Sequence, residues 1–122
     1  MVSSRKTTGN LGETLAADYL QQHGYRIITR NWRCAVGEID VIARDGDTLV
    51  FVEVRTRHGT RHGSPEESIT PRKQAKLIKL AYEYLAAMEE MPEKWRIDVV
   101  AVVLGRQNSP KRITHIPFAV GE

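Results

Sequence analysis

The chain has little of what marks secreted proteins, membrane proteins and cysteine-based zinc proteins. Its single cysteine, Cys34, has no partner for an intramolecular disulfide or for a zinc knuckle. Its longest apolar runs, such as Val99–Leu104, are much too short to cross a bilayer. We find no internal repeat and no low-complexity tract. These absences favour a cytoplasmic protein with no membrane partner.

The 122 residues have the composition of one globular domain, with 41% hydrophobic and 27% charged residues. We therefore expect a single domain over 1–122, with its core at about 9–104. The net charge of +3 is a modest excess that allows a polyanionic partner without establishing one. The basic residues gather in the middle of the chain, at Arg55, Arg57, Arg61, Arg72, Lys73, Lys76 and Lys79.

The hydrophobic pattern predicts two helices and five strands. One helix is expected at about 10–23, and a second from Thr70-Pro71, a cap and first-turn pair, to Pro92. Strands are expected at 25–32, 37–44, 48–57 and 97–104, with a weaker edge strand at 112–120. Residues 58–69 hold glycine, proline and no periodicity, which predicts a mobile loop. The order α-β-β-β-α-β-β predicts an α/β fold, a mixed sheet flanked by helices on one face or both.

Two carboxylates are expected to meet on one face of this sheet. Asp45-Gly46-Asp47 is a strong turn signal that joins the second and third strands as a hairpin. A two-residue turn centred on Gly46-Asp47 places Asp40 opposite Glu53, and one centred on Asp45-Gly46 places the two diagonally. A three-residue loop would send them to opposite faces.

Neighbouring carboxylates repel each other, and a divalent cation such as Mg²⁺ would remove that cost while activating water for attack on a phosphodiester. The alternative is that Asp40 and Glu53 face solvent and pair with basic neighbours such as Arg44 and Arg55. The apolar residues around Glu53 in Val52-Glu53-Val54-Arg55 favour the cation site.

The spacing of Gly37-Glu38-Ile39-Asp40 and Glu53-Val54-Arg55 resembles the PD-(D/E)xK nuclease superfamily. Together with Gly9-Asn10-Leu11-Gly12-Glu13 and the segments around Tyr82 and Asp98, the chain resembles the YraN-type family of uncharacterised bacterial proteins over roughly 9–103. That family is similar to Holliday-junction resolvases. The resemblance implies a restriction-endonuclease-like fold, and Glu13, Asp40 and Glu53 as ligands of Mg²⁺ or Mn²⁺.

Arg55 stands where the superfamily motif usually ends in lysine. A guanidinium cannot be deprotonated and therefore cannot act as a general base. It can still bind a phosphate through two hydrogen bonds, so we hypothesise that Arg55 holds the scissile phosphate.

Two other residues, Glu13 and Gln74, have both a functional and a structural interpretation. Glu13 could be a metal ligand, or the glutamate of a capping box that starts at Asn10. Gln74 shares the apolar stripe of the second helix, so it could hold a metal-ligating group or bond a loop backbone. Glu38 is predicted to support the same acidic site.

The positive charges offer a path for a phosphate backbone. Arg57, Arg61, Arg72, Lys73 and Lys76 are predicted to bind nucleic acid, DNA in preference to RNA. Glu66 and Glu67 could instead neutralise the basic start of the second helix.

The primary hypothesis is a metal-dependent endonuclease, with branched DNA among its candidate substrates; a homodimer would be compatible with it. The alternatives are a non-catalytic nucleic-acid-binding module and a protein-interaction domain with solvated carboxylates.

Overall fold

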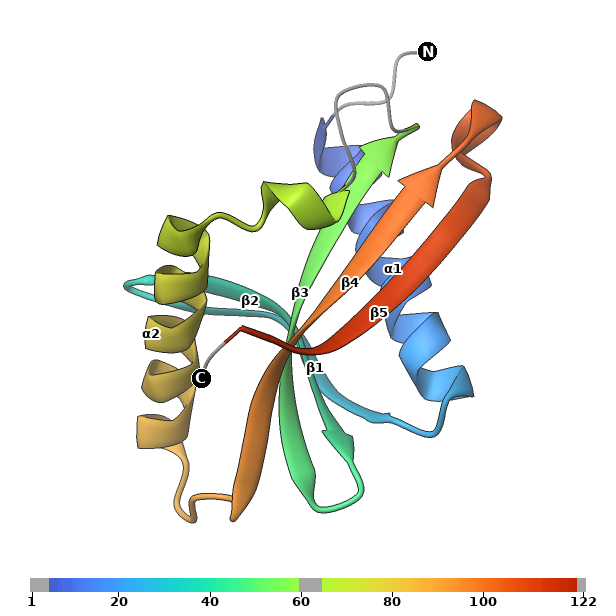
Figure 1. The fold of residues 1–122 in the computed structure, drawn as a ribbon. Coiled ribbons are helices and arrows are strands. Elements are labelled where there is room, and N and C mark those ends of the chain that lie inside the picture. Colours follow the sequence, from blue (N-terminus) through green and yellow to red (C-terminus); the bar gives the residue numbers. More distant parts are fainter. Residues whose placement is uncertain (1–4, 60–64, 121–122) are drawn as a thin grey trace.

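A five-stranded mixed sheet with one helix on each face forms the core of the computed structural model, which describes residues 5–59 and 65–120 (Figure 1). The elements are α1 (Arg5–Gln22), β1 (Arg26–Cys34), β2 (Gly37–Asp45), β3 (Thr48–His58), η1 (Pro65–Ser68), α2 (Pro71–Ala87), β4 (Lys94–Leu104), η2 (Arg106–Asn108) and β5 (Pro110–Val120). Apart from two 3₁₀ turns, this is the predicted order α-β-β-β-α-β-β. The α/β class and the mixed sheet are confirmed.

The strands lie in chain order, β1-β2-β3-β4-β5. All neighbours are antiparallel except β3 and β4, which run parallel because α2 carries the chain back between them. The strand β4 lies inside the sheet between β3 and β5, and every residue from Ile97 to Leu104 is buried, as its apolar sequence predicts. No helix within the described ranges has the length and apolarity that crossing a membrane would need.

The two helices cover opposite faces of the sheet. On one face, Leu77, Leu80 and Leu85 of α2 pack with Phe51 and Ile97. On the other, Ala16 and Leu20 of α1 are among the buried residues that pack with alternate valines of β2, β3 and β4. Of the two arrangements predicted, helices on both faces is the one observed.

Helix α1 begins at Arg5, five residues before the predicted start at Asn10. Asn10 lies inside the helix, where its carbonyl accepts a hydrogen bond from Thr14 Oγ1 at 3.1 Å. The capping-box interpretation of Asn10 and Glu13 is therefore wrong, and Glu13 is free for another role. The end of the helix is close to the prediction: Gly24 has φ +89°, and the Tyr25 N–H donates to the carbonyl of Leu20 at 3.0 Å, the pattern of a glycine-terminated helix.

Two other boundaries differ from the sequence prediction. Helix α2 ends at Ala87, five residues before Pro92, although its start is as predicted, with Thr70 Oγ1 accepting from the Lys73 N–H. The predicted loop 58–69 is partly ordered into the 3₁₀ turn η1, in which Ser68 Oγ donates to the Pro65 carbonyl at 2.6 Å. Residues 60–64 of that loop lie outside the described residues.

The approach of α1 to β3 depends on Gly12. A Cβ added there would lie 1.9 Å from Thr56 Oγ1, whereas a Cβ added at Gly9 would meet nothing within 4 Å. We predict that Gly12→Ala lowers the free energy of unfolding by about 1–3 kcal/mol, because α1 must move outward. Gly9→Ala is the matched control, and its better helix propensity should leave stability unchanged or raise it by up to about 1 kcal/mol. Urea unfolding of both variants checks this; equal effects would contradict it.

A buried ionic network joins β4 and β5 near the C-terminal end of α1. Asp98, whose side chain is fully buried, accepts hydrogen bonds from Arg96 Nε, from His115 Nε2 and from the Phe118 N–H, at 3.0, 2.7 and 3.0 Å. Arg96 also donates to Tyr25 Oη at 2.7 Å. Asp98 and Arg96 therefore form a structural ion pair within the sheet.

Candidate functional site

The acidic site lies where the β2–β3 hairpin opens. Asp45 pairs with Thr48 across the turn Gly46-Asp47, in which Gly46 has φ +61°, and this is the register that points Asp40 toward Glu53. Counted from the turn, strand pairing ends at Val41 and Val52, one position before it would reach Asp40 and Glu53. Beyond it β2 turns toward α2 while β3 continues straight (Figure 1).

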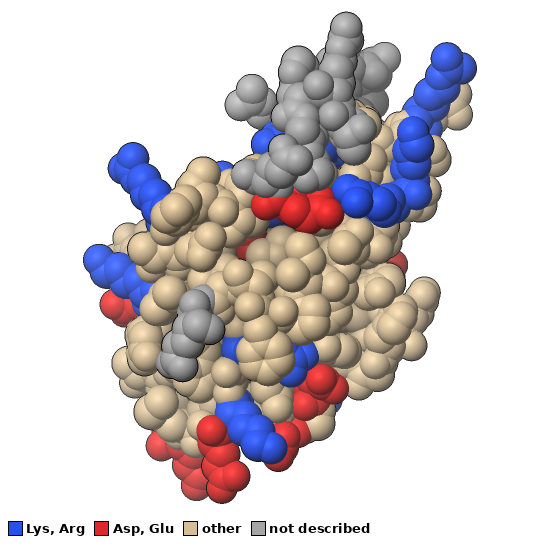
Figure 2. Space-filling model, in the orientation of Figure 1, with Lys and Arg blue, Asp and Glu red and all other residues tan. Residues whose placement is uncertain are grey.

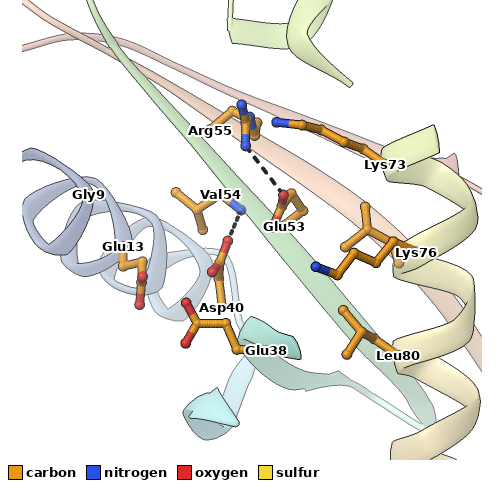
Figure 3. Close-up of a pocket in the computed structure, with 11 residues that line it drawn as sticks. Gly9, Glu13, Glu38, Asp40, Glu53, Val54, Arg55, Lys73, Lys76 and Leu80 are labelled. Atoms are coloured by element: carbon orange, nitrogen blue, oxygen red, sulfur yellow. Dashed lines mark hydrogen bonds and ion pairs between the residues drawn. The ribbon is translucent and has the colours of Figure 1, made fainter. Parts of the chain in front are cut away.

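Where the backbone pairing has ended, the side chain of Asp40 still links β2 to β3. Its Oδ2 accepts a hydrogen bond from the Val54 N–H at 2.8 Å (Figure 3). The opening also removes the sheet as a barrier between the two helices, so side chains from α1 and α2 reach one common space.

That space is a pocket of about 400 Å³. Its charged lining residues are Glu13 from α1, Glu38 and Asp40 from β2, Glu53 and Arg55 from β3, and Lys73 and Lys76 from α2. Seven of the predicted site residues therefore converge, with Glu13, Glu38 and Asp40 on the α1 and β2 side, the lysines on the α2 side, and Glu53 and Arg55 on β3 between them (Figure 3).

Glu13 is almost buried at the pocket, and one of its two carboxylate oxygens has no hydrogen-bond donor among the described residues. Its side chain is 12% exposed, and its buried Oε1 accepts no hydrogen bond from the described residues. The nearest cation, the Arg30 guanidinium, lies 3.9 Å away, too far for a hydrogen bond. Burial, and then the negative charge of Asp40, raise the pKa of Glu13 to about 7.

Glu53 is held beside Asp40 in the same apolar surroundings. Its side chain is 16% exposed. Burial raises the pKa of Glu53 to about 8, and a hydrogen bond with Asp40 and the charge of that carboxylate act in the same direction. The carboxylates of Glu13 and Glu53 therefore lie in a place that disfavours negative charge unless a cation is added.

Arg55 lies on the same face of β3 as Glu53 but is bonded within the protein. Its Nε donates to Ser68 Oγ at 2.8 Å, and its Nη1 lies 3.6 Å from Glu53 Oε2. The guanidinium thus connects the acidic site to η1. Ser68 was not singled out from the sequence, and a lone serine in a loop carries no signal that could have identified it.

The remaining predicted residues are placed less centrally. Gln74 donates its amide to the Ile69 carbonyl at 3.3 Å and does not line the pocket, which is the loop-bonding alternative. Arg57 lines an adjoining pocket with Thr8 and His58, whereas Arg72 is exposed and lines neither. Arg61 lies outside the described residues.

The acidic side chains of the pocket are the candidate ligands of a divalent cation. Among the described residues, no three aspartate, glutamate, histidine or cysteine side chains stand in a complete metal-binding arrangement. Magnesium needs only one or two protein carboxylates, with water and substrate phosphate as its other ligands. Asp40 and Glu53 adjoin closely enough for the Asp40 charge to raise the pKa of Glu53, so these two carboxylates fit a hard cation, and Glu13, whose buried Oε1 has no donor among the described residues, lines the same pocket.

The raised pKa values predict how stability depends on pH. An acid whose pKa is raised by folding binds its proton more tightly in the native state, so the stability it contributes is present below about pH 4.5 and is lost toward pH 7–8. We expect the free energy of unfolding in EDTA to fall by the order of a few kcal/mol across this window. Excess Mg²⁺ should reduce or reverse the fall, because a bound cation favours the ionised carboxylates.

Urea unfolding from pH 5 to 8, in EDTA and in Mg²⁺, measures this dependence. Glu53→Gln should flatten the EDTA profile, whereas Glu38→Gln, at an exposed carboxylate of the same pocket, should change it least. Identical profiles for the wild type with and without Mg²⁺ would contradict the prediction.

Comparison with known proteins identifies the family. The model of the uncharacterised protein family UPF0102 matches residues 12–102. A UPF0102 protein of Roseiflexus castenholzii is 49% identical over 124 aligned residues, covering 100% of this chain and 99% of that protein. One from Pelotomaculum thermopropionicum is 45% identical, covering 98% and 99%. The chain therefore belongs to the UPF0102 family, whose YraN-type members its sequence resembles.

Proposed function

We propose that this protein is a divalent-metal-dependent endonuclease that acts on nucleic acid, with Glu13, Asp40 and Glu53 holding Mg²⁺ or Mn²⁺. The observation that carries the proposal is the convergence of these three carboxylates, one with an unsatisfied buried oxygen, opposite two lysines in one pocket. Glu13 comes from a helix, and Asp40, Glu53 and Arg55 follow the spacing of the superfamily motif. This combination supports placement in the PD-(D/E)xK superfamily.

The bound cation would activate water and neutralise charge that develops on a phosphodiester. The protein's own part is to fix the carboxylates. Asp40 is oriented by the Val54 N–H, Glu53 by Arg55, and Glu13 by its position on α1 over β3. Keeping these groups in place before substrate arrives avoids reorganisation during the reaction.

The charges of the protein are distributed so that a polyanion would be attracted to the end that holds the pocket. Figure 2 shows acidic side chains gathered at the end where α2 leads into β4, where Glu89, Glu90 and Glu93 are exposed. The pocket lies near the opposite end of α2, beside Lys73 and Lys76. A phosphate backbone would be repelled from the acidic end and attracted toward the pocket. DNA is the nucleic acid that we propose, in keeping with the resemblance to junction resolvases.

The test incubates pure protein with end-labelled duplex, single-stranded and four-way-junction DNA and with RNA, in Mg²⁺, in Mn²⁺ and in EDTA. We expect cleavage that requires the metal and stops in EDTA. Salt-sensitive binding without cleavage would replace the proposal with the non-catalytic module. Absence of both cleavage and binding for all four substrates would overturn both.

A further inference from the structure

We propose that Lys73 and Lys76 form the phosphate-binding side of the pocket and that Arg55 is a positioning residue, an assignment that rests on the proposed function. It differs from the sequence hypothesis, in which Arg55 itself holds the scissile phosphate. Three observations carry it: the bonds of Arg55, the unpaired lysine ammonium groups, and the charge balance of the pocket.

Arg55 is committed to the protein on two sides of its guanidinium. The Ser68 hydroxyl accepts from Nε, and Nη1 faces the Glu53 carboxylate. Ser68 Oγ in turn donates to the Pro65 carbonyl, so the three groups form a chain from β3 to η1. Only 23% of the Arg55 side chain is exposed. The residue is therefore suited to fixing Glu53, and rotating it toward a phosphate would break these bonds.

The two lysines are in the opposite condition. Neither ammonium group donates a hydrogen bond or forms an ion pair within the described part of the chain, yet both line the pocket. Figure 3 shows both side chains extending from α2 toward β3. The Lys76 stem lies on Gly37, where an added Cβ would approach its Cε to 3.1 Å. Gly37 thus leaves the room that the lysine needs to reach the pocket.

Glu53 lies close enough to Lys73 for their charges to attract, but no described acid forms an ion pair with either lysine where α2 begins. Lys73 lies in the first turn of α2, where positive charge is disfavoured, so a counterion is expected there. Glu66, one predicted counterion, pairs instead with Arg112 at 3.1 Å. The side chain of Glu67, the other, lies outside what the structure describes.

The charge balance indicates which counterion fits. Four carboxylates and three basic side chains line the pocket. With all seven ionised and one divalent cation bound, one positive charge remains in excess. A single phosphodiester group has the charge that neutralises it, and its oxygens could accept hydrogen bonds from both ammonium groups. The lysines would therefore contact the phosphate from the side opposite the carboxylates.

The experiment measures phosphate contacts separately from catalysis. In an Asp40→Asn background with Mg²⁺, binding of a fluorescein-labelled 30-nucleotide DNA strand is followed by anisotropy at increasing KCl concentration. The logarithm of the binding constant falls linearly with the logarithm of the salt concentration, and each lost phosphate contact should make this slope less steep by about 0.7 for a single strand. We expect Lys73→Ala and Lys76→Ala each to do so, and Arg55→Ala not to. Lys79→Ala removes the same charge from an exposed site on α2 that does not line the pocket, and should leave the slope unchanged.

Cleavage rates complete the test with Asp40 intact. Lys73→Ala and Lys76→Ala should each lower the rate by about 10- to 100-fold. Arg55→Ala should lower it through displacement of Glu53, with partial rescue by Arg55→Lys. A slope that falls in Arg55→Ala but not in the lysine variants would overturn the assignment. Reduced slopes in a protein that cleaves nothing would support the lysine contacts while refuting the nuclease.

Discussion

Replacing Asp40 with asparagine is expected to lower metal-dependent cleavage by about 100-fold or more, because it removes a negative ligand from the proposed cation site. The fold should survive. Asp40 Oδ2 accepts from the Val54 N–H at 2.8 Å, and the asparagine carbonyl oxygen can accept the same bond. Alanine at this position would leave that N–H without its partner, at a cost of about 1–3 kcal/mol in stability if no water replaces it. The asparagine variant therefore separates chemistry from folding.

The measurement is the single-turnover rate on whichever labelled substrate the wild type cleaves, together with the urea midpoint of each variant. Glu53→Gln should match Asp40→Asn, since the two carboxylates adjoin. Glu38→Gln is the control: its side chain is 42% exposed, pairs with Arg33 at 3.2 Å, and should keep most of the activity. An Asp40→Asn protein that cleaves at the wild-type rate would refute the site.

The sequence was sufficient to predict the fold and the central pair of carboxylates because both follow from short-range patterns. Strand alternation and the Asp45-Gly46-Asp47 turn determine which face each side chain takes. The apolar stripe of α2 and the continuous apolar run of β4 similarly determine the layers. These signals depend on neighbours within a few residues.

The opening of the hairpin could not be predicted in the same way. Alternation alone extends the β2–β3 ladder to Asp40 and Glu53, whereas the structure ends it at Val41 and Val52. The two strands separate because β2 packs beneath α2 and because the Asp40 side chain accepts a hydrogen bond from the Val54 N–H. It is also what admits Glu13 and Lys76 to one pocket from opposite faces of the sheet.

The contacts of Arg55 and Gln74 could not be predicted for the same reason, because they too depend on residues that are brought close only by the tertiary structure. A strand position shows which face Arg55 occupies, but its bond to Ser68 crosses thirteen positions and a loop without periodicity. The amide of Gln74 likewise bonds Ile69, a partner set by how the chain enters α2. The type of residue predicted a polar contact in each case, and only the tertiary structure supplies the partner.

The largest loss of stability is expected from Asp98→Ala, which would leave the buried Arg96 with the half-exposed Asp45, 3.3 Å away, as its remaining counterion. The Arg96 side chain is 9% exposed, and the Asp98 carboxylate satisfies donors from three residues of β4 and β5. Removing one member of a buried pair typically costs about 3–5 kcal/mol, because the remaining charge stays desolvated. We expect this variant to unfold at much lower urea, and Asp98→Asn to be destabilised as well, since an amide has one accepting oxygen and Asp98 accepts at both of its carboxylate oxygens.

Asp47→Ala is the matched control for that measurement. Asp47 pairs with Lys94 at 3.7 Å, but 74% of its side chain is exposed, so the pair is screened by solvent and its loss should produce no measurable change. A similar result for Asp98→Ala would mean that water reaches Arg96. The network lies outside the pocket, so variants that remain folded should retain metal-dependent cleavage. Loss of cleavage in a folded Asp98→Asn protein would instead connect the β4–β5 network to the pocket through β3, which β4 flanks along its whole length.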